Sequence, residues 1–421
     1  MLTFEQAFTI VRDTLRASAP QASAETVPLN EAHGRVLADG LFADRDYPPF
    51  DRATRDGFAV RSADVTDVPK MLTVVGLARA GAPYRGGLVG QGCTVEIMTG
   101  APVPEGADAV VMVEYTREET PQSSSGDGPT VRHVEILRPV KPFDNIVHQG
   151  SEAKVGASVL PRARRLGPGE IGLAAMIGAT ELNVFRRPTV AILPTGDEVV
   201  GAGERPEWFE IRNCNALALA AQVEAAGGVP RLLGIARDNK HNLRALIEEG
   251  LGCDLLVLSG GISVGKYDFV AEVLQGLGAE MRFQGVAIRP GKPLAFGRVG
   301  RRFFFALPGN PVSTFVTFEL FARPALTFLA GAEFEQPVFL RARLAKPVRQ
   351  NTGLTVFMPA HVVARDDLPN SQGDEPVVGL VGWHGSGDLV SLAAANCFLV
   401  VHPDQTNLAP GDWVDVLPKS W

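Results

Sequence analysis

The feature that most constrains the fold is a series of short apolar segments, each followed by a turn rich in glycine and proline, between residues 187 and 331. Three of them, at 189–193, 254–258 and 302–307, have the length of a buried strand. Strands that alternate with helices predict a doubly wound, mostly parallel sheet. The other expected elements are a strand at 232–236 and helices at 215–226, 241–249, 267–276 and 312–329.

Ligands of such sheets bind beyond the carboxyl ends of the strands. Here those ends carry Pro-Thr-Gly-Asp-Glu at 194–198, Ser-Gly-Gly-Ile-Ser-Val-Gly at 259–265 and Pro-Gly-Asn-Pro-Val-Ser at 308–313. Glycine permits the close backbone approach that a phosphate-binding turn needs, and Pro311 at a helix start leaves neighbouring N–H groups for an anion. One such motif alone favours a tight turn, but three at one edge favour a polyanion site. The candidate binding residues are Ser259, Gly260, Gly261, Ser263, Pro308, Gly309, Asn310, Pro311 and Ser313.

Three carboxylates accompany these turns, namely Glu198, Asp238 and Asp268. Carboxylates beside an anion site suggest Mg²⁺, or another divalent cation, bound by oxygen ligands and bridging phosphates. Each of them alone could equally be a helix cap or a solvated side chain. Lys292, in Arg-Pro-Gly-Lys-Pro at 289–293, is a candidate phosphate partner, and a surface lysine is an equally good interpretation of its spacing.

Composition excludes several classes of function. A net charge of −7 disfavours nonspecific nucleic-acid binding, and no apolar run suggests a membrane span. The four cysteines are scattered, which disfavours disulfides and structural zinc. The first residues form a helical pattern, with Thr3 and Gln6 as a capping box, and not a secretory signal, so we expect a cytoplasmic protein.

One glycine pattern is misleading. Gly-Pro-Gly-Glu-Ile-Gly at 167–172 fits the dinucleotide-binding motif of a nicotinamide oxidoreductase. Arginines precede it where that motif requires a buried strand, so we interpret it as the start of a helix at 166–177. Elsewhere, short β-rich runs at 71–77, 93–98, 109–114 and 131–137 predict a β domain, and short strands return after residue 335.

Taken together, the motifs resemble the MoeA family, which includes the E domain of gephyrin, over essentially the whole chain. The matching stretches include Pro-Phe-Asp at 49–51, Asp-Gly-Phe-Ala-Val-Arg at 56–61 and Met-Thr-Gly-Ala-Pro-Val-Pro-Glu-Gly at 98–106. The three turns described above and Pro-Gly-Lys-Pro at 290–293 match as well. The last match is Gly-Ser-Gly-Asp-Leu-Val-Ser-Leu-Ala-Ala-Ala-Asn at 385–396. In this order, the set is highly specific.

The resemblance implies an elongated homodimer of four-domain subunits. Domain I would combine residues 1–45 with 144–185, and domain II would be an inserted β domain at 46–143. Domain III, at 186–331, would be the α/β domain, which resembles molybdopterin adenylyltransferases. Domain IV, at 335–421, would be a C-terminal β domain. The expected fold class is therefore multidomain α/β plus β.

The resemblance also implies an activity. Enzymes of this family insert molybdenum from molybdate into adenylylated molybdopterin with a divalent cation, and they release AMP and molybdenum cofactor. By position, Asp56, Thr99, Glu198, Asp238 and Asp268 match functional residues, of which the last three are the expected metal ligands. The site is expected to combine the α/β domain of one subunit with the Asp56 and Thr99 loops of the other. Molybdopterin adenylyltransferase and molybdoenzymes are the expected partners.

Several positions depart from the family pattern. Arg-Ala-Thr-Arg at 52–55 replaces Asn-Ser-Ala-Met, Ser151-Glu152 replaces Glu-Asp, and Asn213-Cys214 replaces Asp-Ser/Thr. Gln284 and Arg289 stand where lysines are common, and the final domain lacks an arginine pair near residues 351–353. These departures favour an alternative, a paralogue that binds or delivers molybdopterin or the finished cofactor without catalysis. The retained carboxylates favour the enzyme. We also expect Arg52 and Arg55 to face the anionic ligand and offset the missing lysines.

Overall fold

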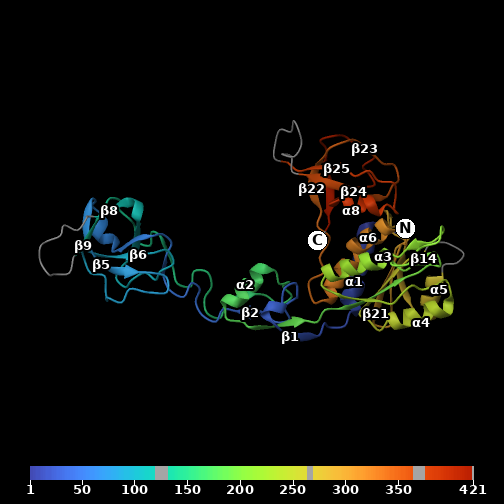
Figure 1. Ribbon diagram of the computed structural model, residues 1–421, viewed down its shortest axis with the longest axis horizontal. Coiled ribbons are helices and arrows are strands. Elements are labelled where there is room, and N and C mark those ends of the chain that lie inside the picture. Colours follow the sequence, from blue (N-terminus) through green and yellow to red (C-terminus); the bar gives the residue numbers. More distant parts are fainter. Residues whose placement is uncertain (119–130, 263–268, 364–374, 420–421) are drawn as a thin grey trace. The chain divides into compact units, whose positions relative to one another are not determined.

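The computed structural model describes residues 1–118, 131–262, 269–363 and 375–419. Its internal contacts divide the chain into two compact units. Unit 1 comprises Met1–Asp39, Ala163–Gly167 and Glu181–Trp421, and unit 2 comprises Gly40–Arg162 and Pro168–Thr180. Figure 1 labels many of their helices and strands. The expected fold class is confirmed, because an α/β domain, an inserted β domain and a C-terminal β domain are all present.

The centre of unit 1 is a six-stranded sheet in the order β16-β13-β17-β21-β20-β18. The first four strands run parallel, and β20 and β18 extend the sheet antiparallel at one edge. The parallel strands are β13 Thr189–Pro194, β16 Val229–Leu232, β17 Leu255–Ser259 and β21 Arg302–Leu307, and the antiparallel ones are β18 Glu280–Gln284 and β20 Ala295–Val299.

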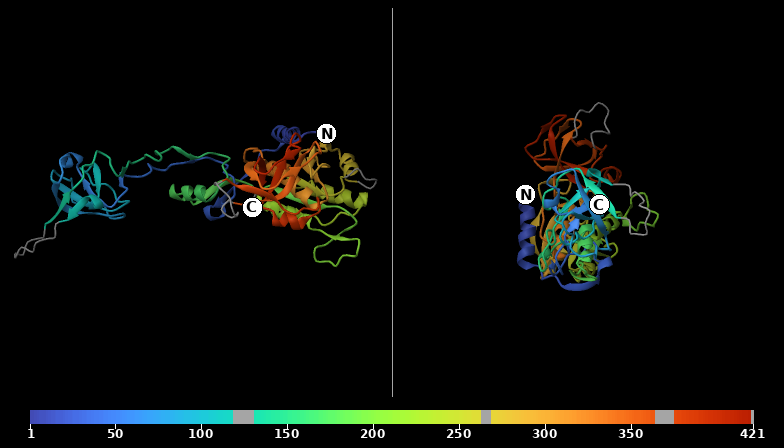
Figure 2. Two further views of the ribbon diagram at one scale, coloured as in Figure 1. Left: turned by 90° about the horizontal axis from the view of Figure 1, so that it is seen from above. Right: turned by 90° about the vertical axis from the view of Figure 1, so that its left-hand side faces the viewer.

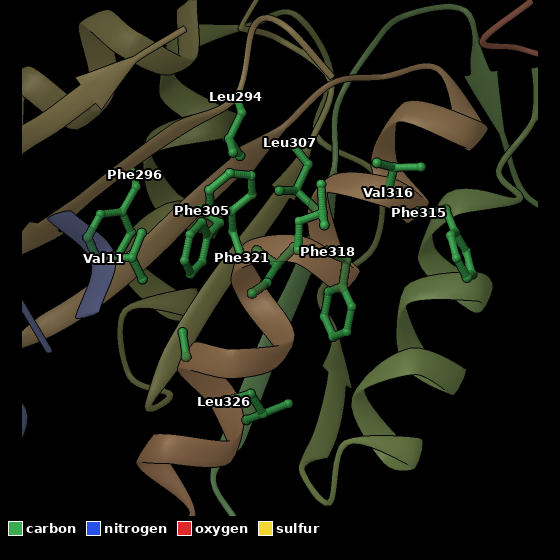
Figure 3. Packing of buried hydrophobic residues seen from close by; sticks show 14 of the residues in the cluster. Val11, Leu294, Phe296, Phe305, Leu307, Phe315, Val316, Phe318, Phe321 and Leu326 are labelled. Atoms are coloured by element: carbon green, nitrogen blue, oxygen red, sulfur yellow. The ribbon is translucent and has the colours of Figure 1, made fainter. Parts of the chain in front are cut away.

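Helices cover both faces of this sheet because its strands are apolar on both sides. Along β21, Phe303 and Phe305 pack against α1, α3, α6 and α7, whereas Phe304 packs against α4 and α5 on the opposite face. Figure 3 shows Phe305 and other side chains of the apolar cluster that it forms with these first four helices. The helices are α1 Phe4–Ser18, α3 Asn215–Ala225, α4 Lys240–Gly250, α5 Phe269–Gly276, α6 Pro311–Thr317 and α7 Arg323–Leu329. This is the predicted doubly wound arrangement.

Helix α1 begins with the predicted capping box, in which Thr3 and Gln6 exchange hydrogen bonds between side chain and backbone. Its apolar face carries Phe8, Val11 and Leu15, which are buried in the cluster of unit 1. Both views of Figure 2 show α1, in blue, at an outer side of the α/β domain. The N-terminal segment is therefore tied to this domain by burial of apolar surface.

The predicted helix at 312–329 is continuous from Pro311 to Leu329, with a π-helical segment, η4 Phe318–Ala322, between α6 and α7. This stretch is long and apolar enough to cross a membrane, but 78% of it is buried within the protein. Burial explains the apolar composition, because the helix lies in the core of unit 1.

Two details of the sheet differ from the sequence prediction. The strand expected at 232–236 lies instead at Val229–Leu232, and Ala236 makes only an isolated bridge to Thr195. The chain leaves the sheet at Gly234, whose φ of +87° ends regular pairing. Strands β18 and β20 were not predicted, because their mixed polar and apolar residues lack the continuous apolar run of a central strand.

The C-terminal part of unit 1 is a second six-stranded sheet, in which an additional pairing of β24 with β26 closes the sheet on itself. Strand β19, Ile288–Arg289, joins it to the α/β domain by pairing with β24. The other elements are β22 Leu340–Leu344, β24 Thr355–Val363, β25 Val377–Leu380, α8 Leu389–Ala394, β26 Cys397–Val401 and β28 Trp413–Pro418.

Unit 2 is built around the inserted sheet, in the order β7-β4-β6-β5-β9-β8. The sheet carries a separate apolar cluster on each face. Its strands are β4 Gly57–Val60, β5 Lys70–Ala78, β6 Cys93–Ile97, β7 Ala109–Met112, β8 Thr116–Glu118 and β9 Arg132–Ile136. Strands β5, β6, β7 and β9 match the four predicted β runs, whereas β4 and β8 were not predicted. Helix α2, Pro168–Met176, begins within the glycine pattern, as expected from its flanks. The four domain boundaries expected from the resemblance remain a prediction.

Candidate functional site

The three glycine- and proline-rich turns lie at one edge of the sheet in unit 1. Strands β13, β17 and β21 are direct parallel neighbours, so the turns that follow them are adjacent. The Thr195 N–H donates to the Ser259 carbonyl at 3.0 Å, and the Gly260 N–H donates to the Leu307 carbonyl at 3.0 Å. All three turns line one cleft of about 490 Å³. This volume lies within the range of small-molecule sites.

The structure brings most of the predicted site residues of unit 1 together. Those that line the cleft are Glu198, Asp238, Ser259, Gly260, Gly261, Pro308, Gly309, Asn310 and Pro311. Lys292 and Ser313 do not line it: Lys292 is exposed beside the lining residue Pro293, and Ser313 is buried in α6. Ser263 and Asp268 lie outside the described residues.

Backbone N–H groups supply the anion-binding character of the cleft. Those of Gly261, Gly309 and Asn310 have no hydrogen-bond acceptor within the described part of the chain. Gly260 and Gly261 have φ values of +96° and +68°, a conformation that glycine adopts without strain. Successive N–H groups in such a turn form a concave donor surface for an oxyanion.

The start of α6 differs from the sequence prediction. Pro311 occupies the first turn as expected, but the N–H of Val312 is not free for an anion. It donates at 2.9 Å to the carbonyl of Ser386, in the C-terminal domain, and the Asn310 amide donates to the Ser386 hydroxyl at 2.8 Å. Figure 1 shows α8 of that domain beside α6. The C-terminal domain therefore caps this helix, because a buried N–H needs an acceptor.

Asn215 at the start of α3 connects two of the turns. Its amide nitrogen donates to Ser259 Oγ at 2.8 Å and to the Gly309 carbonyl at 2.6 Å. The Ser259 hydroxyl therefore accepts from Asn215 and keeps its own hydrogen for another acceptor. The sequence prediction missed Asn215, although an asparagine beside the first turn of a helix was a visible signal. Thr195, which also lines the cleft, was missed as well.

Two carboxylates, Glu198 and Asp238, line the cleft, and Asp197 lies next to them. The backbone N–H of Asp238 donates to the Asp197 carboxylate at 3.0 Å. Burial raises the pKa of Asp238, and the nearby negative charges of Asp197 and Glu198 raise it further. Within the described residues, no group of three His, Cys, Asp or Glu side chains is arranged to hold a metal ion. The ligand set that includes Asp268 therefore stays a prediction.

The charged side chains that line the cleft do not by themselves favour a polyanion. Of the described lining residues, only Arg212 is cationic, and its Nε is engaged with the Glu204 carbonyl at 2.9 Å. Two lining residues, Glu198 and Asp238, are acidic. An anionic ligand must therefore be neutralised mainly by N–H and hydroxyl donors and by a further cation.

Asp56 and Thr99, the remaining predicted residues, belong to unit 2, where they contact each other. The Thr99 backbone N–H and hydroxyl both donate to Asp56 Oδ1, at 2.6 and 2.8 Å. These hydrogen bonds lower the pKa of Asp56, with the backbone N–H as the larger cause. A Cβ on Gly57 would lie 1.9 Å from the Val111 carbonyl oxygen, so only glycine fits after Asp56. Asp56 is thus an exposed, ionised carboxylate in a fixed position.

The chain is similar to proteins of one family along almost its whole length. Family models match residues 2–178 as "MoeA N-terminal region (domain I and II)", residues 191–327 as "Probable molybdopterin binding domain" and residues 341–419 as "MoeA C-terminal region (domain IV)". A relative from Bacillus subtilis, named molybdopterin molybdenumtransferase, is 33% identical over 94% of this chain and 90% of its own length. A relative of the same name from Haemophilus influenzae is 32% identical over 99% and 98%.

Solved structures give the same result. A molybdopterin biosynthesis protein MoeA from Pyrococcus horikoshii shares 28% sequence identity and a TM-score of 0.79, with full coverage of both chains. A further MoeA structure from Pyrococcus horikoshii shares 30% identity and a TM-score of 0.71, also with full coverage. The similarity therefore extends to the whole set of domains and is not confined to the α/β domain.

Proposed function

Because the chain belongs to the MoeA family, we propose that it is a molybdopterin molybdenumtransferase, which inserts molybdenum from molybdate into adenylylated molybdopterin and releases AMP and molybdenum cofactor. The names of its relatives support this activity. The structural observation that carries it is the cleft lined by three turns, two of which present N–H groups that have no acceptor among the described residues. Phosphate and molybdate are tetrahedral oxyanions, and the same donors suit both.

The residues of the cleft have distinct roles in this proposal. The N–H groups of Gly261, Gly309 and Asn310 bind oxyanion oxygens and stabilise negative charge that develops when the phosphoanhydride is cleaved. Asn215 keeps the second and third turns at a fixed separation through its two hydrogen bonds. Phosphoanhydride cleavage depends on position and charge neutralisation more than on covalent participation of the protein.

We further propose that Glu198 and Asp238, together with Asp268, bind Mg²⁺ or another divalent cation. The raised pKa of Asp238 supports this, because crowded carboxylates lose their mutual repulsion when a cation is bound. A bound cation would supply charge neutralisation on the phosphoryl oxygens. The low number of cationic side chains in the cleft lining is consistent with that need.

The proposed active form is a homodimer in which the Asp56 and Thr99 loops of one subunit complete the cleft of the other. The fixed, ionised Asp56 carboxylate supports a role in ligand contact, because it faces solvent and pairs only with Thr99 within the described residues. Light scattering should give about twice the subunit mass of 44.9 kDa. A monomer at micromolar concentration would contradict the shared site.

The proposed location is the cytoplasm. Its proposed partners are the molybdopterin adenylyltransferase that supplies the substrate and the molybdoenzymes that receive the cofactor.

The decisive experiment follows AMP release from adenylylated molybdopterin by the purified protein, with and without molybdate and Mg²⁺. We expect AMP release only when both are present. Substrate binding without AMP release would contradict the enzyme and favour the carrier. The carrier alternative is based on the positions at which the sequence departs from the family pattern. The curated relatives, in contrast, are named as transferases.

A further inference from the structure

Thr195 follows strand β13 directly, at the edge of the sheet that lines the cleft. Its backbone is fixed on both sides, because its N–H donates to the Ser259 carbonyl and it forms a parallel bridge with Ala236. The residue is 6% exposed and lines the cleft. Its Oγ1 has no hydrogen-bond partner among the residues that the structure describes. A buried hydroxyl without a partner is unfavourable, and such groups in native proteins usually have a specific role.

The two glycines of the neighbouring turn lie directly against this hydroxyl. A Cβ added to Gly261 would lie 2.7 Å from Thr195 Oγ1, and one added to Gly260 would lie 3.0 Å from it. The distance at Gly261 is shorter than real Cβ contacts, so any other residue would have to displace Thr195. Because residues 260 and 261 are glycines, the backbone of the turn can approach the hydroxyl of Thr195 closely.

We infer that the Thr195 hydroxyl is a ligand-binding donor, which gives a hydrogen bond to an oxygen of the tetrahedral oxyanion held by the Ser259–Gly261 turn. This inference rests on the proposed function. The oxyanion is either molybdate or the phosphate of the adenylyl group, and both offer the same acceptor oxygens. A neutral donor suits this position, because a cationic side chain would be drawn to the carboxylates of Glu198 and Asp238, which line the same cleft.

The test compares two readouts in the full-length protein: anion affinity by calorimetry, with molybdate alone and with AMP alone, and the Tm without ligand. Thr195→Val removes the hydroxyl at nearly constant volume, and Thr195→Ser keeps it. Because hydrogen bonds to charged groups are strong, we expect Thr195→Val to weaken binding of at least one anion by roughly tenfold or more. Since Oγ1 has no partner among the described residues, the Tm of this variant should not fall. Thr195→Ser should retain most of the affinity.

Thr189→Val is the matched control, because it removes a threonine hydroxyl from the first residue of β13, at the end of the strand opposite to Thr195. The Thr189 hydroxyl donates to Asp254 Oδ2 at 2.9 Å. This variant should therefore lower the Tm and leave anion affinity unchanged. The two substitutions thus have opposite expected patterns, which a general effect on β13 would not produce.

Each contrary outcome identifies what has failed. Unchanged affinity for both anions in Thr195→Val would overturn the inference, as would equal losses in Thr195→Ser and Thr195→Val, which would indicate packing of the methyl group. A fall in Tm with unchanged affinity would assign the hydroxyl a structural role. Wild-type protein that binds neither anion would instead contradict the proposed function. The anion that loses affinity identifies which oxyanion Thr195 contacts.

Discussion

Arg52 and Glu152 form a salt bridge in unit 2, with Arg52 Nη2 3.0 Å from Glu152 Oε1, although a hundred residues separate them in the chain. The pairing of β3, Arg52–Ala53, with β10, Ile146–Val147, brings the two segments together. Both residues stand at positions where the resemblance implies other residues, and in the structure their charges compensate each other. The positive charge of Arg52 is therefore paired within unit 2, and its contact with the ligand stays a prediction. Arg55 is exposed and has no ion-pair partner within the described residues.

The Arg52–Glu152 pair should contribute little to stability. Both side chains are about half exposed, at 43% and 50%, and exposed pairs contribute roughly 0–1 kcal/mol. In a double-mutant cycle with Arg52→Gln and Glu152→Gln, we expect a coupling free energy of unfolding below about 1 kcal/mol that decreases with added salt. A coupling well above that range would mean that the pair is effectively buried.

The two arginines should differ in their effect on ligand binding. Arg55→Met should weaken binding of adenylylated molybdopterin at low salt by roughly 2- to 5-fold, because it removes an unpaired charge. Arg52→Asn is the control and should have a smaller effect, because the charge it removes is already neutralised by Glu152. The measurement is affinity as a function of ionic strength. Equal effects of both substitutions at every ionic strength would argue against this distinction.

Asp238 should show opposite effects with and without a divalent cation. Its folded-state pKa is raised, so stability falls as pH rises from the unfolded pKa through the folded one, and the full cost is present above the folded-state pKa. Asp238→Asn should therefore maintain or raise the Tm at pH 7 without metal. The same substitution should abolish the rise in Tm on addition of Mg²⁺ and reduce AMP release roughly tenfold or more.

The Mg²⁺-dependent rise in Tm of the wild type should also disappear as pH falls through the raised pKa of Asp238, because protons compete with the metal. Glu198→Gln should behave like Asp238→Asn. Normal turnover of both variants across a Mg²⁺ titration would remove them from the metal site.

The substitution Asn215→Ala should weaken ligand binding in addition to lowering stability. Asn215→Ala breaks the hydrogen bonds to Ser259 and Gly309, at a cost of about 1–3 kcal/mol in the free energy of unfolding. Because the two turns then lose their connection, we expect oxyanion affinity to fall roughly tenfold. Asn396→Ala is a matched control, since it also breaks two hydrogen bonds, both to the backbone of Val362, away from the cleft lining. If both variants bound anions equally well, Asn215 would have no positioning role.

Thr99 should control the ionisation of Asp56. Thr99→Val removes the hydroxyl donor but keeps the backbone N–H, so the pKa of Asp56 should rise only part of the way to its ordinary value. Carboxyl NMR titration of the full-length protein measures this change, and Asp56→Asn identifies the resonance by its loss. A pKa that does not move would show that the hydroxyl contributes nothing to the low value.

The sequence determined the architecture because local patterns report burial directly. The apolar runs of β13, β17 and β21 are buried on both faces, so nearly every residue in them had to be apolar. The turns after them could be located because glycine and proline have few alternative uses at the end of a strand. Likewise, the capping box at Thr3 and Gln6 depends only on residues three apart. In each of these cases the interaction lies within a few residues of the chain.

Only the tertiary structure decided which side chains act together. The distance from Arg52 to Glu152, the capping of α6 by Ser386, the connection of two turns by Asn215 and the contact of Gly261 with Thr195 all join segments far apart in sequence. No local pattern encodes such contacts, because they depend on strand order and register. The sequence therefore predicted an anion-binding edge, whereas packing determined which donors at that edge remain free to bind a ligand.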